Sequence, residues 1–320
     1  MRLVADIGGT HCRFALADDE GKLSRVETFK AANYATLEQA VETYLNAGNC
    51  QPETACLAVA GPTTHQSMVM TNLSWHSSSA QLNSRFGFRL SAFINDFEAI
   101  ALSIPALEAA DFLPVANAQS NSAQLDLTLP VSILGPGTGL GVAQLIPSGK
   151  HFHAIATEGG HTSLQAATHK EQAVFAYWQG RGIALSRESF LSGPGLLRLY
   201  TGLCALEDSE CAADSGDSVS QLAARGDGLA AQALDMFLSL LGSAAGDQAL
   251  ACGSRGGVIL AGGILPKMRD QLLNGRFRER FEAKAPMQHY LQRIATNLIV
   301  HPNPGLLGAS RRTLTGTSGD

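Results

Sequence analysis

Two aspartates of this 320-residue chain stand at the ends of apolar segments, where they could bind a metal ion or act on a substrate. Asp6 lies in an apolar segment that begins at Leu3, and Asp96 comes shortly after the segment that ends at Ile94. In α/β sheets, ligands gather at the carboxyl ends of the strands. A carboxylate there can hold Mg²⁺, directly or through water, or accept a proton from a hydroxyl group. The alternative for Asp96 is that it caps the helix expected after it.

Glycines follow the first aspartate and recur farther along the chain. Gly8, Gly9 and Thr10 separate two apolar segments, and Gly-Pro-Gly-Thr-Gly-Leu-Gly at residues 135–141 repeats the arrangement. Glycine permits tight turns whose backbone N–H groups can approach a phosphate. A plain hairpin is the alternative for either loop. The recurrence favours two loops that hold one phosphate chain from both sides. Residues 135–141 match neither the Walker motif nor the dinucleotide fingerprint.

Other polar residues suggest contacts with a polyol or a nucleoside. Asn95, beside Asp96, offers both a donor and an acceptor. Glu158 and His161 are separated by two glycines, so we expect a loop that contacts vicinal hydroxyls rather than a helical metal site; a capping role for either residue is the alternative. Glu188 could be a second carboxylate for a polyol, although by itself it is only an acid at a helix start.

The apolar strand expected at residues 256–264 contains a third glycine turn, at Gly262 and Gly263. Backbone exposed at Gly262 and Gly263 would let a nucleobase or ribose lie close, and a plain strand-to-helix turn is the alternative.

The apolar periodicity predicts the elements that position these residues. Strands are expected at residues 3–7, 14–17, 23–30, 56–60, 68–70, 90–94, 131–134, 142–146, 154–157, 256–264 and 297–300. Helices are expected at residues 37–45, 79–86, 99–104, 171–179, 217–225 and 227–252, with another beginning at Pro266 and a last one near the C-terminus. Trp75 and Trp178 are expected to be core residues. This mixture predicts an α/β fold.

Length and composition limit the class of protein. A chain of 320 residues suits two domains, and Pro105 together with the polar segment 116–124 marks a boundary. The net charge of −5 argues against a broad nucleic-acid surface. The six cysteines lack the Cys-x-x-Cys spacing of structural zinc sites, so we expect reduced thiols in a cytoplasmic protein. We expect no signal peptide, because strand-like sequence starts at residue 2, and no apolar run near the 20 or so residues of a membrane span.

Seven motifs, taken in order, resemble those of bacterial glucokinases in the hexokinase and actin-like ATPase superfamily, over essentially the whole chain. They are Asp6-Ile-Gly-Gly-Thr10 with Arg13, Ile94-Asn-Asp-Phe97, Gly135-x-Gly-Thr-Gly-Leu-Gly-Val-Ala143, Glu158-Gly-Gly-His161, Leu191-Ser-Gly-Pro-Gly195, Ala261-Gly-Gly263 and Asn303-Pro-Gly-Leu-Leu-Gly308. The resemblance implies a two-domain actin-like ATPase (ribonuclease H-like) fold with a cleft between a small domain, residues 1–109 plus 303–320, and a large domain, residues 110–302. It also implies a homodimer.

The resemblance further implies phosphorylation of D-glucose at its 6-hydroxyl by ATP with Mg²⁺, giving glucose 6-phosphate and ADP. Asp96 stands at the position of the family's general base, and Asp6 would hold Mg²⁺ through water. The implied sugar ligands are Asn95, Asp96, Glu158, His161 and Glu188. The implied nucleotide contacts are Ala5, Asp6, Ile7, Gly8, Gly9, Thr10, Gly137, Thr138 and Gly139 for the phosphates, with Gly262 and Gly263 beside the adenosine.

Two residues depart from the family pattern. His11 stands where asparagine is usual, beside the first glycine loop, which predicts a nucleotide affinity that depends on pH near neutrality. Pro136 stands where a small residue is usual, which predicts a stiffer second loop.

Two other functions compete with this interpretation. One is a kinase for another hexose, such as mannose, fructose or an amino sugar, although the cysteine-rich zinc signature of the repressor and open-reading-frame kinase group is missing. The other is a non-catalytic sugar sensor or transcriptional regulator on the same fold. Such regulators carry a helix-turn-helix before the first glycine loop, whereas five residues precede Asp6 here.

Overall fold

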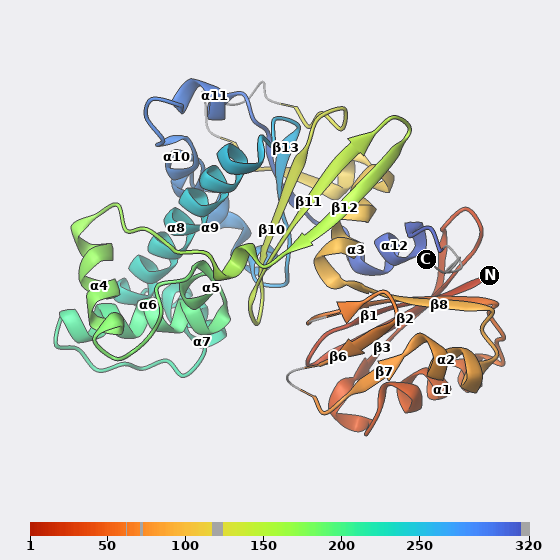
Figure 1. Cartoon of the computed structure of the whole chain (residues 1–320). Helices are drawn as coiled ribbons and strands as arrows, with labels where there is room; N and C mark the ends of the chain where they lie inside the picture. Colours follow the sequence, from red (N-terminus) through yellow and green to blue (C-terminus); the bar gives the residue numbers. More distant parts are fainter. Residues whose placement is uncertain (62, 71–72, 117–123, 315–320) are drawn as a thin grey trace. The chain divides into compact units, whose positions relative to one another are not determined.

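The computed structural model describes residues 1–61, 63–70, 73–116 and 124–314. The chain divides into two compact units: Met1–Glu108 with Phe152–Ala156 and His301–Asp320, and Ala109–His151 with Thr157–Val300 (Figure 1). The sequence predicts divisions after residues 109 and 302, whereas the units divide after Glu108 and Val300, and it does not predict that residues 152–156 group with the first unit. The boundary markers at residues 117–123 lie outside the described residues.

A five-stranded mixed sheet forms the centre of the first unit, in the order β3-β2-β1-β4-β8. Strand β1 pairs antiparallel with β2 and parallel with β4, which pairs parallel with β8. A small sheet, β5-β6-β7, lies in the same unit. The bounds are β1 Arg2–Ile7, β2 His11–Ala17, β3 Leu23–Lys30, β4 Thr54–Val59, β5 Thr63–Thr64, β6 Ser67–Val69, β7 His76–Ser78 and β8 Leu90–Asn95.

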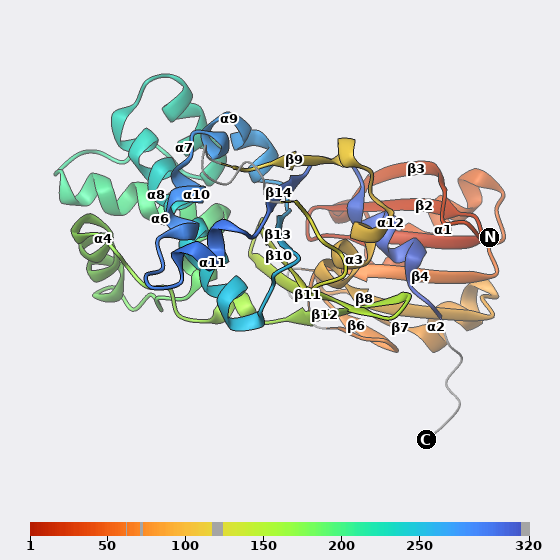
Figure 2. The same ribbon diagram turned by 90° about the horizontal axis from the view of Figure 1, so that it is seen from above.

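Helices cover both faces of this sheet (Figure 1). Helices α1 (Leu37–Gly48) and α2 (Ser79–Phe86) lie on one face, while α3 (Asp96–Ser103) and α12 (Pro304–Arg311) lie side by side on the other (Figure 2). Strand side chains alternate between the two faces: Leu3 belongs to the core with α1, and Val4 to the core with α12. Asp6 shares the alternation of Val4, so it faces α12.

Two predicted helices of the first unit begin at side chains that cap them. Thr36 accepts a hydrogen bond from the Gln39 N–H at 3.3 Å and begins α1, and Ser78 accepts one from the Gln81 N–H at 3.2 Å and begins α2. Trp75 is 3% exposed, and its indole N–H donates to the Tyr34 carbonyl, which confirms it as a core residue.

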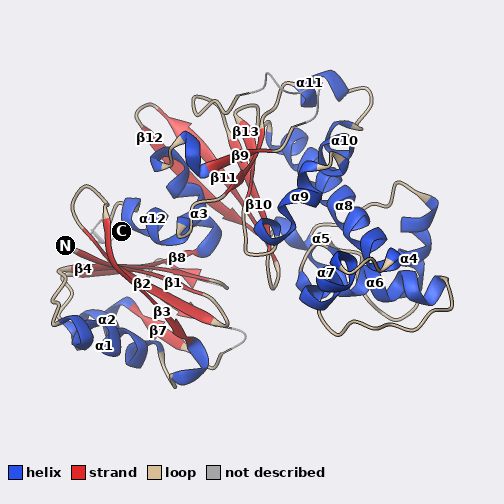
Figure 3. Cartoon of the chain, turned by 180° about the vertical axis from the view of Figure 1, so that it is seen from behind, coloured by secondary structure: helices blue, strands red, loops and turns tan. Residues whose placement is uncertain are grey.

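A six-stranded sheet, in the order β12-β11-β10-β13-β14-β9, and a group of helices make up the second unit, except that Phe152–Ala156 of β12 group with the first unit (Figure 3). The strands are β9 Phe112–Pro114, β10 Val131–Pro136, β11 Leu140–Ser148, β12 His151–Thr157, β13 Gly257–Leu260 and β14 Thr296–Ile299. The α-helices are α4 His169–Gln179, α5 Arg187–Phe190, α6 Gly193–Leu206, α7 Gly216–Ala224, α8 Gly228–Cys252, α9 Arg269–Leu273, α10 Arg276–Glu282 and α11 Gln288–Gln292.

Helix α8 is the core of the second unit. It contacts β10, β13, α6, α7 and α10. Among the described residues it is the one helix long and apolar enough to span a membrane, with a mean hydropathy of 1.3 over its most apolar window. The expectation of no such apolar run is therefore wrong. However, 72% of that window is buried inside the protein, so these apolar residues already have a partner in the core.

Several element boundaries differ from those predicted. Strand β10 continues to Pro136 and β11 begins at Leu140, so only residues 137–139 of the second glycine segment form the turn. Pro136 therefore belongs to a strand. The last helix begins at Pro304 and includes the Gly305–Gly308 stretch, and α3 begins at Asp96 rather than Ala99.

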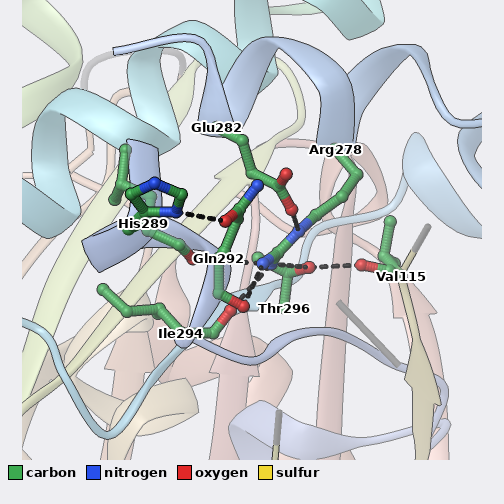
Figure 4. Close-up of polar contacts among 8 residues, drawn as sticks. Val115, Arg278, Glu282, His289, Gln292, Ile294 and Thr296 are labelled. Carbon is green, nitrogen blue, oxygen red and sulfur yellow. Dashed lines mark hydrogen bonds and ion pairs between the residues drawn. The ribbon is translucent and has the colours of Figure 1, made fainter. Parts of the chain in front are cut away.

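A buried arginine connects α10 to the start of β14 (Figure 4). Arg278 is 1% exposed and donates to Glu282 at 2.5 Å, to Thr296 at 3.0 Å and to the Ile294 carbonyl at 2.7 Å. It also donates to the Leu291 and Gln292 carbonyls at 3.1 and 3.2 Å. The Thr296 hydroxyl in turn donates to the Val115 carbonyl, beyond β9. A single guanidinium thus organises the segment that leads into β14.

Replacing this arginine should destabilise the protein strongly. Arg278→Met removes a buried charge, its ion pair with Glu282 and the donor shared by several buried carbonyls, so we expect the free energy of unfolding to fall by about 3–5 kcal/mol. Arg276→Met on the same helix removes an exposed ion pair with Glu279 and should change it by less than about 1 kcal/mol. Urea unfolding measures both values, and equal losses in the two variants would contradict the role of Arg278.

Candidate functional site

The first glycine loop lies at the tip of the hairpin between β1 and β2. The last strand pair joins Ile7 to Cys12, the Gly8 N–H donates to the His11 carbonyl at 2.9 Å, and the Thr10 carbonyl accepts from the Ala31 N–H at 3.0 Å. Gly9 and Thr10 are exposed. The hairpin alternative therefore describes the backbone correctly, and the loop still presents residues to which a phosphate could bind.

Asp6 lies half-buried at the end of β1, beside Arg13 and α12. Its Oδ2 is 3.3 Å from the Arg13 Nη1. A Cβ added at Gly305 would lie 3.0 Å from the Asp6 carboxyl carbon, so α12 approaches this carboxylate closely because residue 305 has no side chain. Burial raises the pKa of Asp6, and the Arg13 guanidinium opposes that rise. Within α12, Gly305 thus contacts the sheet, whereas Gly308 packs against the Ala99 carbonyl of α3.

Asp96 begins α3, but its neighbour is the cap. Asn95 Oδ1 accepts hydrogen bonds from the Phe97 N–H at 2.9 Å and the Glu98 N–H at 3.2 Å. The capping alternative for Asp96 is therefore wrong. Asp96 Oδ1 accepts a further bond from the Phe97 N–H at 3.0 Å.

The electrostatics of Asp96 suit proton transfer near neutrality. Burial raises the pKa of Asp96 to about 7, the negative charge of Asp6 adds to the rise, and hydrogen bonds to the carboxylate oppose it. A carboxylate with such a pKa is half ionised near pH 7, which is the condition for an efficient general base. The first unit therefore brings together the two aspartates that the sequence singles out.

The second glycine loop lies among other glycine-containing segments. The Gly137 N–H donates to the Gly139 carbonyl at 2.8 Å, and the Gly193 N–H donates to the Gly137 carbonyl at 2.8 Å. Gly262 has φ +85°, and a Cβ there would lie 2.5 Å from the Pro136 carbonyl oxygen. The structure thus brings the Gly262–Gly263 turn beside the second loop. The contact of Gly193 with Gly137 was not predicted from the sequence. The only sequence signal for it is that Gly193 belongs to the Leu191–Gly195 motif.

Glu188 contacts the second glycine loop directly. Its Oε2 accepts a hydrogen bond from the Leu140 N–H, where β11 begins, at 2.9 Å. A Cβ at Gly139 would lie 2.4 Å from this same oxygen. Glu188 belongs to the short helix α5, 48 residues away from Leu140 in the chain. No local pattern in the sequence signals this contact.

Glu158 and His161 flank a single 3₁₀ turn at Gly159–His161. The Glu158 carboxylate lies 3.7 Å from the His161 Nε2, and their side chains are 86% and 60% exposed. A Cβ at Gly160 would lie 2.3 Å from the Leu140 carbonyl oxygen. The three predicted sugar-contacting residues of the second unit are therefore gathered around Leu140. Within the described ranges, no group of three or more His, Cys, Asp or Glu side chains is arranged as a metal site.

Comparison with known proteins gives a consistent result. A family model described as Glucokinase matches residues 3–315. The chain is 38% identical to the glucokinase of Nitrobacter hamburgensis over 317 residues, covering 98% of this chain and 97% of that protein. The crystal structure of a glucokinase from an Antarctic psychrotroph superposes with a TM-score of 0.84 at 35% identity, covering 97% of each chain. A Balamuthia mandrillaris glucokinase, solved with glucose, gives a TM-score of 0.80 at 22% identity, covering 97% of this chain and 92% of that one. These similarities confirm the predicted actin-like ATPase fold class.

The raised pKa of Asp96 predicts how stability depends on pH. The pKa of Asp96 is higher in the folded state than in the unfolded chain. Its contribution to the free energy of unfolding is therefore fully present below about pH 4 and is lost as pH rises through about 7. Asp96→Asn keeps the acceptor for the Phe97 N–H and has no charge. We expect it to be more stable than the parent at pH 8 by about 2–4 kcal/mol, with the difference shrinking towards pH 4.

Urea unfolding at several pH values measures this difference. Asp126→Asn is the matched control, because hydrogen bonds from Thr128 lower the pKa of this exposed carboxyl group and the sign reverses: the substitution should destabilise at pH 8. A pH-independent difference for Asp96→Asn would show that Asp96 is not held in this environment.

Proposed function

This chain belongs to the glucokinase family and is an enzyme that phosphorylates glucose, and we propose that it transfers the γ-phosphoryl group of ATP to the 6-hydroxyl of D-glucose with Asp96 as the general base. The products are glucose 6-phosphate and ADP. The observation that carries the proposal is Asp96, a carboxylate whose pKa is raised to about 7 by burial and by Asp6. Phosphoryl transfer asks the protein mainly for alignment, charge stabilisation and one proton acceptor.

The sugar contacts follow from the hydrogen-bonding state of each residue. Asn95 Oδ1 already accepts two backbone bonds, so its NH₂ group is what this residue offers a hydroxyl. Asp96 accepts the 6-hydroxyl proton. Glu158, His161 and Glu188, gathered around Leu140, are the sugar contacts that the second unit would supply. We infer that both units contribute to one cleft, which closes on its substrates and excludes water so that ATP is not hydrolysed.

The nucleotide contacts divide in the same way. The Ala5–Thr10 segment of the first unit and the Gly137–Gly139 turn of the second would bind the phosphates through backbone N–H groups. The Gly262–Gly263 turn, packed against Pro136, would border the adenosine.

The carboxylates of the first unit fit Mg²⁺. Asp6 and Asp96 offer hard oxygen donors, and a divalent cation would offset both the burial and the Asp6 charge that raise the pKa of Asp96. Asp6 would hold the ion through water. The bound ion would supply charge neutralisation at the transferred phosphoryl group. The homodimer and the cytoplasmic location stay predictions.

Removing Asp96 should abolish turnover without unfolding the protein. For Asp96→Ala we expect kcat for glucose-dependent ADP release to fall by about 10²- to 10⁴-fold, with ATP binding retained, because general-base catalysis contributes about that factor. A coupled ADP assay measures turnover, and the same assay with mannose, fructose and amino sugars tests the rival hexoses. Near-normal turnover in the variant would remove Asp96 from the mechanism.

The same carboxylate should set the acid limb of the pH profile. We expect log(kcat/KM) for glucose to rise with pH and to level off above about 7, where Asp96 is ionised. Saturating ATP removes the pH-dependent nucleotide affinity expected from His11, and a His11→Asn variant tests that expectation separately. A flat profile between about pH 5 and 8 would contradict the assignment of Asp96 as base.

A further inference from the structure

Hydrogen bonds within the protein hold the backbone around Glu188 in place without any substrate. The Arg187 N–H donates to the Thr162 carbonyl at 2.9 Å, just beyond the Glu158–His161 turn. The Ser192 hydroxyl donates to the Glu188 carbonyl at 2.8 Å, and Ser192 also caps α6. Helix α5 is thus attached on one side to the turn that carries Glu158 and on the other to the start of α6.

The side chain of Glu188 then fixes the second glycine loop. Its Oε2 accepts from the Leu140 N–H at 2.9 Å, which sets where β11 begins and where the Gly137–Gly139 turn ends. Gly139 leaves room for this carboxylate, since a Cβ there would lie 2.4 Å from the same oxygen. The far side of the turn is held by the bond from the Gly193 N–H to the Gly137 carbonyl. The turn is therefore fixed at both ends by the α5–α6 segment.

We propose that Glu188 is a positioning residue for the phosphate-binding loop, and that it couples sugar binding to nucleotide binding through the Leu140 N–H. A carboxylate has two oxygens, so Oε2 can hold the loop while Oε1 meets a sugar hydroxyl. A hydroxyl that orients the carboxylate also strengthens its hold on the loop, and by linkage each ligand then tightens the binding of the other by the same factor. This proposal depends on the proposed function, which assigns sugar and phosphate to these groups.

Three variants separate the loop contact from the sugar contact. Glu188→Gln keeps an oxygen that can accept from the Leu140 N–H, so we expect the Kd of a non-hydrolysable ATP analogue to stay within about threefold of the parent. Glu188→Ala removes the acceptor and should raise that Kd about tenfold or more. Glu158→Ala removes a proposed sugar contact whose carboxylate pairs with His161 rather than with the Leu140 N–H. This variant should therefore weaken glucose binding while leaving nucleotide binding unchanged.

The coupling is measured by calorimetry with glucose and the ATP analogue, each titrated alone and in the presence of the other. In the parent and in Glu158→Ala, glucose should tighten nucleotide binding; in Glu188→Ala this factor should approach one. Gly139→Ala is an independent variant in which Glu188 is intact but displaced by the added methyl group, and it should lose nucleotide affinity as Glu188→Ala does. Circular dichroism shows that each variant is folded.

The outcomes distinguish this proposal from the proposed function. If the parent binds the nucleotide and releases ADP with glucose, but Glu188→Ala binds the nucleotide as tightly as the parent does, Glu188 acts on the sugar alone and the coupling role is wrong. If the parent neither binds the nucleotide nor releases ADP with glucose, the proposed function itself fails, and the coupling role fails with it.

Discussion

Asp6 and Asp96 stand within electrostatic range of each other in a largely buried part of the first unit, and both carboxylates are harder to ionise there than in water. Two such groups are brought together only if other interactions in the fold outweigh the free energy that this costs. The parallel pairing of β1, β4 and β8 places the two strand ends at the same edge of the sheet. Arg13 compensates Asp6 in part. A cation and a substrate hydroxyl could offset this free-energy cost, which is the physical reason for proposing that the two carboxylates take part in the reaction.

The second unit has a different feature, which is that glycines allow its backbone segments to pack close together. Gly160 lies against the Leu140 carbonyl, Gly139 against the Glu188 carboxylate and Gly262 against the Pro136 carbonyl. The approaches of Gly160 and Gly262 to backbone oxygens leave no room for a Cβ, so they depend on glycine, whereas a Cβ at Gly139 would displace the Glu188 carboxylate. The peptide of Leu140 is the common point, since its N–H and its carbonyl face different segments. Backbone groups presented in this way suit a ligand rich in oxygen atoms.

The sequence predicted most of the elements because local patterns determine them. The third strand and α2 agree with the structure residue for residue, since alternation, helical periodicity and the capping residue Ser78 are all local signals. The exact length of the glycine turn was not predictable, because its end is set by Glu188, which is remote in the chain. The contact of Gly305 with Asp6 also depends on tertiary packing alone. Asn95 rather than Asp96 is the cap. The sequence could not distinguish the two, because either residue type can fill that position.

The two ends of the described chain meet in the first unit. The Arg2 guanidinium donates to the Ser310 and Arg312 carbonyls at 3.0 and 2.7 Å, and Gly305 on the same helix lies beside Asp6. The first unit is therefore interrupted by the second in the order of synthesis, and α12 leaves the ribosome only after the second unit. A nascent chain that has completed the second unit still lacks the wall that Gly305 forms beside Asp6. A chain that stops before Pro304 would contain the whole second unit and leave Asp6 open on that side.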